Sequence, residues 1–183
     1  MPLDLEPPRP TEILAPDQIE AVVNQSGWVG IACRLMLLCG LRVGEAMAVR
    51  SSDIDSRGML IVDRAVKPDG IGRTKTRRKR TVPVPPMLLA EIRAMGRAPG
   101  ELLFYKDNGS AYRSNEFGKL VDFQTRRLRT TFATLIPAST QGVQSMLGHT
   151  SPRTTLAYYQ MALPENNRRD VDALEEKLRR KAG

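Results

Sequence analysis

The chain has 183 residues, which is enough for one domain with a hydrophobic core but short for two large ones. It carries 28 lysines and arginines against 20 acidic residues, so its formal net charge is +8. No apolar run approaches the roughly 18 residues that cross a bilayer, and the first ten residues lack the layout of a signal peptide. We therefore expect a cytoplasmic protein, without membrane association, that binds a polyanion such as nucleic acid.

The content of metal-binding residues is low. The chain has one histidine and two cysteines, which excludes a zinc site. Cys33 and Cys39 lie in an apolar segment, so we expect them to be reduced thiols in the core. We expect no metal and no small-molecule cofactor.

The first residues, 1–11, are rich in proline and predict an extended lead-in. The spacing of apolar residues, with charged or proline residues where helices would begin, predicts helices before residue 51 and after residue 85. Between them, "GMLIVDRAV" (58–66) and "RKRTVPVP" (78–85) are short and rich in β-branched residues, which predicts a small antiparallel sheet. We expect a mostly α fold with one three-stranded antiparallel sheet (α+β). The predicted helices cover residues 17–25, 28–39, 42–50, 86–95, 114–123, 125–136, 140–148 and 154–163.

The positive charge is concentrated in the connection of that sheet. Residues 64–80, "RAVKPDGIGRTKTRRKR", contain eight basic residues and one acidic residue, Asp69. The segment lacks the G-x-x-x-x-G-K-[ST] pattern of a nucleotide-phosphate loop, and its flanks predict strands on both sides. A hairpin that reaches toward DNA fits better, although a charge run can also be a solvated loop.

Two arginine motifs point to a phosphate site. In "GLRVGE" (40–45), Arg42 begins a helix directly after a buried one, and Glu45 lies one turn further on, where it can orient the guanidinium. In "TRRLRTTFATLI" (125–136), Leu128, Phe132 and Leu135 form a buried stripe, while Arg126 and Arg129 share another face. Two arginines on one rigid face can chelate a phosphate, and the alternative is a solvated basic face.

The single histidine and a pair of tyrosines follow near the end of the chain. His149 comes just after a helix end at Gly148, as a neutral donor suited to a phosphate oxygen. Nine residues later, Tyr158 and Tyr159 lie in one predicted helix. Tyr159 shares an apolar stripe with Leu156, whereas Tyr158 lies on the polar side. If one tyrosine is free to react, we expect it to be Tyr158.

The ordered set "GLRVGE", a hairpin lysine before "TVPVP", "RxxR" followed by "TFAT", "LGHTS" and "TTLAYY" resembles the catalytic domain of tyrosine recombinases, the phage integrase family. The resemblance covers residues 12–163, which we interpret as the DNA breaking and rejoining domain. It implies a site-specific DNA recombinase, a DNA strand transferase that acts through a 3′-phosphotyrosine intermediate without metal or nucleotide. The charged tail, 164–183, resembles a segment that contacts a neighbouring protomer, so we expect self-assembly on double-stranded DNA as a dimer to tetramer.

The resemblance also implies the role of each site residue. Lys75 matches the hairpin lysine, which protonates the departing 5′ oxygen, because it precedes Pro83 by eight residues. Tyr158 matches the nucleophile. The residues that would hold the phosphate are Arg42, Arg126, Arg129 and His149, and those that would contact the DNA backbone are Arg73, Arg77, Arg78, Lys79 and Arg80.

Three departures from the family pattern leave the activity of this chain open. Arg126 stands where the family has histidine or lysine, and arginine is a poor general base. The segments between Lys75 and Arg129, and between Arg129 and His149, look shorter than usual. The lead-in before residue 12 is too short for the N-terminal DNA-clamping domain. The alternatives are therefore an excised catalytic domain, a minimal recombinase, or a degenerate relative that regulates by binding DNA without cutting it.

Overall fold

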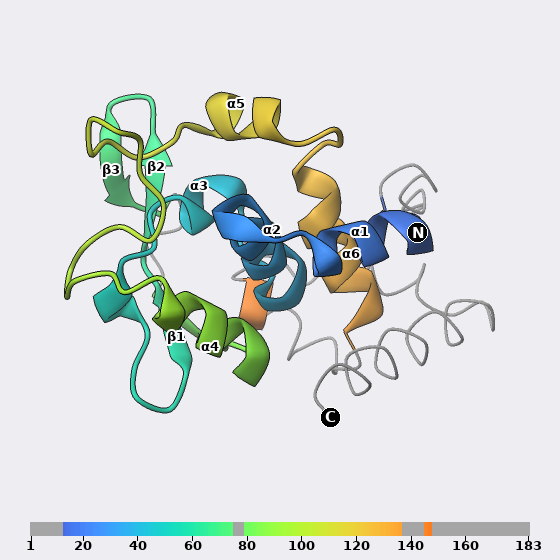
Figure 1. Cartoon of the computed structure of the whole chain (residues 1–183), viewed down its shortest axis with the longest axis horizontal. Helices are drawn as coiled ribbons and strands as arrows, with labels where there is room; N and C mark the ends of the chain where they lie inside the picture. The colour runs from blue at the N-terminus through green and yellow to red at the C-terminus, as the bar shows by residue number, and fades with distance from the viewer. Residues whose placement is uncertain (1–12, 75–78, 137–144, 148–183) are drawn as a thin grey trace, which may run out of the picture.

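The computed structural model describes residues 13–74, 79–136 and 145–147, and these form a helical body with short strands along one side (Figure 1). Helix α2 (Gly27–Cys39) lies in the middle of this body and contacts α1 (Pro16–Asn24), α3 (Val43–Ala46), α4 (Pro86–Ala94) and α6 (Arg126–Leu135). Two short elements, α5 (Ser114–Phe117) and the 3-10 turn η3 (Gly118–Leu120), lead into α6. Among the described residues, no helix is long and apolar enough to cross a membrane.

Helix α2 is central because its sequence is apolar nearly all round, as in a helix that is buried on every side. Its residues Leu35 and Met36 are fully buried. Cys33 and Cys39 are buried and form no disulfide, which confirms that they are core thiols, and burial raises the pKa of each to about 12. The one charged residue buried on this helix, Arg34, donates to the carbonyl of Gln25 and pairs with Glu91 on α4.

The β structure differs from the single three-stranded sheet that the sequence predicted. There are four short strands in the described part, and they form two separate ladders: β1 (Met59–Val62) with β4 (Arg80–Pro83), and β2 (Arg64–Lys67) with β3 (Gly70–Arg73). Both ladders are antiparallel. The extended stretch 59–67 changes partner at Asp63, whose carbonyl accepts the Thr74 amide hydrogen at 3.0 Å. The two ladders therefore follow one another along the same stretch instead of lying side by side.

The predicted helices are confirmed where the structure describes them, and the ends of α1, α2, α4 and α6 lie within one residue of the prediction. The helix expected over 42–50 closes after one turn as α3, and the one expected over 114–123 splits into α5 and η3. Only residues 145–147 of the helix expected over 140–148 are described, and they are helical. The helix expected over 154–163 lies outside the described residues.

Helix α6 is fixed to the N-terminal side of the body by long-range contacts. Its buried face carries Leu128 and Phe132, as the apolar stripe predicted, and Leu135 is partly buried against the core. Arg127 donates to the carbonyl of Ile13 at 2.5 and 3.2 Å, and Thr131 accepts the Leu14 amide hydrogen at 2.9 Å. These bonds set the rotation of α6, and so they decide which way its remaining arginines point.

Gly40 ends α2 in the left-handed region, with φ of +66°, and substitution by alanine is expected to lower the free energy of unfolding by about 2–5 kcal/mol. Side chains other than glycine cost roughly 1–2 kcal/mol in this region. A Cβ at Gly40 would also lie 2.6 Å from the Phe132 ring, and overpacking of a core costs about 1–3 kcal/mol more. Urea unfolding at constant m value measures the change.

Gly96 supplies the matched control, because it has φ of +63° but open space where a Cβ would lie. Gly96→Ala should therefore cost only the backbone part, about 1–2 kcal/mol. Equal losses in Gly40→Ala and Gly96→Ala would show that the approach of Phe132 to Gly40 does not constrain this turn.

Candidate active site

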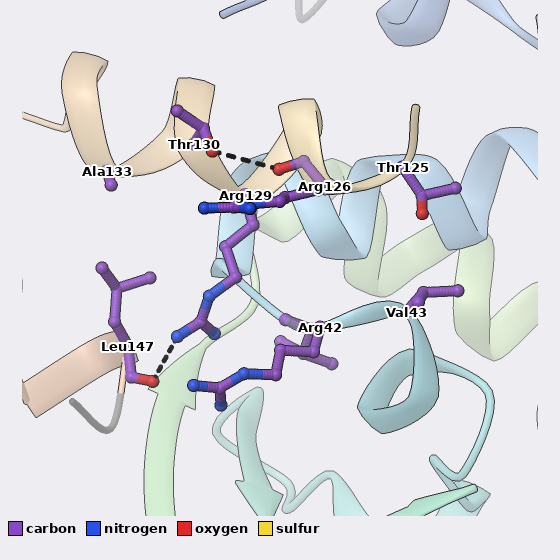
Figure 2. Close-up of a pocket in the computed structure, with 9 residues that line it drawn as sticks. Arg42, Val43, Thr125, Arg126, Arg129, Thr130, Ala133 and Leu147 are labelled. Atoms are coloured by element: carbon purple, nitrogen blue, oxygen red, sulfur yellow. Dashed lines mark hydrogen bonds between the residues drawn. The ribbon is translucent and has the colours of Figure 1, made fainter. Parts of the chain in front are cut away.

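A cavity of about 360 Å³ lies between the start of α3 and the outward face of α6 (Figure 2). Arg42, at the start of α3, and Arg126 and Arg129, on α6, all line this cavity. The sequence predicted that Arg126 and Arg129 share a face of one helix, and the structure brings that face to Arg42, which is far away in the chain. The other lining residues are Leu41, Val43, Thr125, Thr130, Ala133 and Leu147.

Arg129 is held by two backbone carbonyls at the wall of this cavity. Its guanidinium donates a short hydrogen bond to the carbonyl of Gly40 and another, of 2.6 Å, to the carbonyl of Leu147 (Figure 2). Its side chain is 11% exposed. Carbonyl oxygens orient a guanidinium without cancelling its charge, so this position presents a fixed positive charge to an anion in the cavity.

Arg42 is anchored through Glu45, as the "GLRVGE" motif predicted. The Glu45 carboxylate accepts the Arg42 backbone amide hydrogen at 2.8 Å, which caps α3, and a guanidinium hydrogen at 3.0 Å. Glu45 is 2% exposed, whereas the Arg42 side chain is 47% exposed. Arg42 is therefore held by Glu45 while about half of its side chain remains exposed.

Arg80 corrects a prediction from the sequence. It was expected to contact DNA phosphates, but its side chain is 8% exposed and forms two hydrogen bonds with the Glu45 carboxylate, of 2.6 and 3.0 Å. A third bond, of 2.7 Å, joins its Nε to the carbonyl of Met146. The pattern of β4 contains the signal that was missed: Arg80 lies two residues before the buried Val82, so both point to the core side of the strand.

Glu45 is thus the shared anion of the site. Besides Arg42 and Arg80, Arg129 lies 3.8 Å from it. Burial alone raises the pKa of Glu45, but the hydrogen bond and charge of Arg80, the Arg42 amide and the charge of Arg129 lower the pKa overall. Since Glu45 stays ionised, three guanidinium charges face one carboxylate, and an excess of positive charge remains at the cavity.

This lowered pKa predicts how stability depends on pH. A group whose pKa is lower in the folded state binds fewer protons there, so its stabilisation is complete above its unfolded pKa and is lost as pH falls through the folded value. We expect the free energy of unfolding to decrease below about pH 4.5, the ordinary value for a glutamate, and Glu45→Gln to remove part of that slope. Denaturant titrations between pH 2 and 7 measure it; identical slopes in the two proteins would contradict the assignment.

The remaining predicted site residues fall into two groups. Arg73, at the end of β3, and Lys79, just before β4, are exposed beside the two ladders. Their exposure leaves both able to reach a DNA backbone. Lys75, Arg77, Arg78, His149 and Tyr158 lie outside the described residues.

The sequence matches a family model and curated proteins that are phage integrases. The model of the family described as the phage integrase family matches residues 13–165. The integrase of Mycobacterium phage FRAT1 is 31% identical over 84% of this chain and 55% of its own length. The integrase of Mycobacterium phage L5 is 30% identical over 84% of this chain and 49% of its own length. The chain therefore spans about half the length of these relatives.

Solved structures share the fold. The Tn1549 transposon integrase, in complex with a circular intermediate DNA, matches with a TM-score of 0.69 and 21% identity over 86% of this chain and 63% of its own. The XerH site-specific recombinase, bound to a palindromic difH substrate, matches with a TM-score of 0.62 and 16% identity over 90% of this chain and 53% of its own.

The catalytic domain of bacteriophage HP1 integrase has a TM-score of 0.59 and 21% identity, over 82% of this chain and 88% of that domain. The helix-rich α+β fold with small antiparallel sheets is thus that of tyrosine recombinase catalytic domains. A family model that covers most of the sequence, with this fold and the order of the motifs, leads to one conclusion: the chain belongs to the phage integrase family.

Proposed function

We propose that residues 12–163 are the DNA breaking and rejoining domain of a site-specific recombinase. The observation that carries the proposal is the convergence of Arg42, Arg126 and Arg129 on one cavity, from segments more than 80 residues apart. A phosphodiester bears its negative charge on two non-bridging oxygens, and rigid guanidinium groups match that geometry.

In the proposed reaction, the phenolic oxygen of Tyr158 attacks the phosphorus of one DNA strand, and its proton passes to water. The bond from phosphorus to the 5′ oxygen breaks, and Lys75 gives a proton to that oxygen as it leaves. A 3′-phosphotyrosine link and a free 5′ hydroxyl result. A 5′ hydroxyl from another strand then attacks the link, which releases the tyrosine and rejoins the DNA.

The arginines act on the charge that develops during this attack. As phosphorus becomes pentacoordinate, its non-bridging oxygens gain charge, and Arg42, Arg129 and His149 would bind them more strongly than in the substrate. Arg129 suits this role because its hydrogen bonds to Gly40 and Leu147 hold it before the substrate arrives. A group that is already in place costs no reorganisation in the transition state.

The partner is double-stranded DNA, bound largely through its phosphates. Arg73, the last residue of β3, and Lys79, just before β4, are exposed. Together with Arg77 and Arg78 they would give affinity without base recognition. Residues 164–183 would contact a neighbouring protomer, so the active form on DNA is a dimer to tetramer. The protein would act in the cytoplasm.

A second function is favoured by one observation, the nature of the residue at position 126. Among the described residues that line the cavity, no histidine, lysine or carboxylate is present. By the resemblance to the family, Arg126 stands where histidine or lysine is usual. Arginine binds phosphate but does not exchange protons near neutral pH. A DNA-binding regulator that does not cleave would have such a cavity.

Trapping of the covalent intermediate separates the two functions. The full chain is incubated with nicked and supercoiled DNA that carries the recombination site of a phage whose integrase is similar, such as Mycobacterium phage L5. The reaction is then quenched in detergent. A recombinase leaves protein attached to the 3′ phosphate and releases a free 5′ hydroxyl, which a kinase can label. Binding that decreases with salt, without any attached protein on cognate DNA, would favour the regulator.

A further inference from the structure

Arg80 has no role in the proposed reaction, yet it lies beside the residues that line the cavity. It comes from β4, pairs across the ladder with Val62 on β1, and lies on the core side of the strand. From there it forms two hydrogen bonds with the Glu45 carboxylate, 2.6 and 3.0 Å long, and is 8% exposed. Two parallel bonds between a guanidinium and a carboxylate form the strongest type of ion pair in proteins, especially when both partners are buried.

Without Arg80, Glu45 would compete with a substrate phosphate. Its carboxylate already accepts a hydrogen bond from the Arg42 guanidinium at 3.0 Å, and Arg129 lies 3.8 Å away. A buried carboxylate that loses its main partner draws the nearest remaining cations toward itself. Those cations are Arg42 and Arg129, which both line the cavity.

We propose that Arg80 is a positioning residue, which neutralises Glu45 so that the charges of Arg42 and Arg129 are directed to the phosphate in the cavity. This inference rests on the proposed function, because it concerns the same phosphate. Arg80 acts through Glu45 and does not touch the DNA itself.

A further hydrogen bond joins Arg80 to the segment 145–147, whose residue Leu147 lines the cavity. Its Nε donates to the carbonyl of Met146 at 2.7 Å, and the next carbonyl, of Leu147, accepts from Arg129 at 2.6 Å. Arg80 thus ties β4, at the end of the basic hairpin, to the segment that holds Arg129. Lysine has one donor centre and cannot form the two bonds to Glu45 and the bond to Met146 with the same geometry.

The inference is tested by removing the charges of the pair singly and together in the full chain. Arg80→Met leaves Glu45 with Arg42 and Arg129 as its only described cations. The double variant Glu45→Gln, Arg80→Met removes both charges of the pair and keeps similar side-chain volumes. Two quantities are measured: the affinity for inorganic phosphate, from NMR signals of the arginine side chains, and the rate of covalent attachment to DNA. The first does not require cleavage, so it tests the inference even if the proposed reaction fails.

We expect Arg80→Met to weaken phosphate binding and attachment by roughly tenfold, the midrange of couplings between contacting residues, and the double variant to restore most of both. Arg80→Lys should be intermediate, and it replaces Arg80→Met in the comparison if the latter does not fold. The matched control is the exposed pair Arg57–Asp55, with side chains 82% and 35% exposed. Arg57→Met, with and without Asp55→Asn, changes charge equally but should alter neither quantity.

Other outcomes overturn the inference. If Arg80 were itself a DNA contact, Arg80→Met would lower DNA affinity and reduce the salt dependence by about one ion, and Glu45→Gln would not reverse the loss. If phosphate does not bind the wild-type protein, or binds all variants equally, Arg80 does not act on the phosphate site. Absence of attachment in the wild type, with the expected phosphate affinities, would reject the proposed reaction and keep the role of Arg80.

Discussion

Replacement of Arg129 by glutamine is expected to lower the rate of DNA strand cleavage by roughly 10²–10³-fold, the usual effect of removing one preorganised donor to a developing oxyanion. Duplex affinity should change little, because the backbone contacts proposed for the basic hairpin supply most of it. Arg129 is suited to such an effect since Gly40 and Leu147 already hold its guanidinium at the cavity. Single-turnover attachment to a nicked substrate, with filter binding in parallel, measures both quantities.

Arg127 offers the matched control for this prediction. It lies two residues earlier on the same helix, but its guanidinium bonds the carbonyl of Ile13 and the side chain of Gln18, away from the cavity. Arg127→Gln should lower stability and leave the cleavage rate of the folded protein within a few-fold of the wild type. Arg129→Lys should recover little, because a single ammonium cannot reproduce a two-pronged contact. Equal loss of cleavage in the Arg127 and Arg129 variants would mean that α6 acts only as a scaffold.

Replacement of Tyr158 by phenylalanine is expected to abolish the covalent adduct, the largest effect that we predict. In the proposed reaction the phenolic oxygen forms the bond to phosphorus, and phenylalanine keeps the ring without that oxygen. Binding to DNA should persist with the same salt dependence, since tyrosine supplies no charge to the interface. Denaturing gels of quenched reactions, with labelled DNA, show the adduct directly.

Tyr159→Phe is the control, because it removes the same atom one residue later in the chain. The expectation that Tyr158 reacts and Tyr159 is an apolar anchor rests on the helical pattern of the sequence, and both residues lie outside the described part of the structure. Tyr159→Phe should therefore keep the adduct. Loss of the adduct in Tyr159→Phe alone would exchange the two roles.

Several features of this protein follow from local sequence patterns. The order of the motifs from "GLRVGE" to "TTLAYY" identified the family, and the excess of basic residues pointed to a polyanionic partner. The apolar stripe of α6 fixed which of its residues are buried, and therefore which face carries Arg126 and Arg129. The faces of a helix follow its period of about 3.6 residues, so the sequence of that one segment is enough to assign them.

Other features were decided by the tertiary structure. Arg80 and Glu45 are 35 positions apart in the chain, and the sequence around each residue does not indicate that the other is its partner. The same holds for the division of the strands into two ladders, since a β-rich segment shows that it will pair but not with which partner. The site depends on such pairings: the alternation along β4 could have shown that Arg80 faces the core, but only the fold placed it against the Glu45 carboxylate.

The difference has a physical cause. Helix propensity and apolar periodicity depend on residues a few positions apart, so they are the same however the helices pack against one another. The energy of a buried ion pair depends on the absence of water and on the position of both partners, which packing alone provides. The sequence by itself thus determined the family, the helical faces, the positive charge and the local pairing of Arg42 with Glu45, whereas the assembled core decided that Arg80 and Arg129 join them.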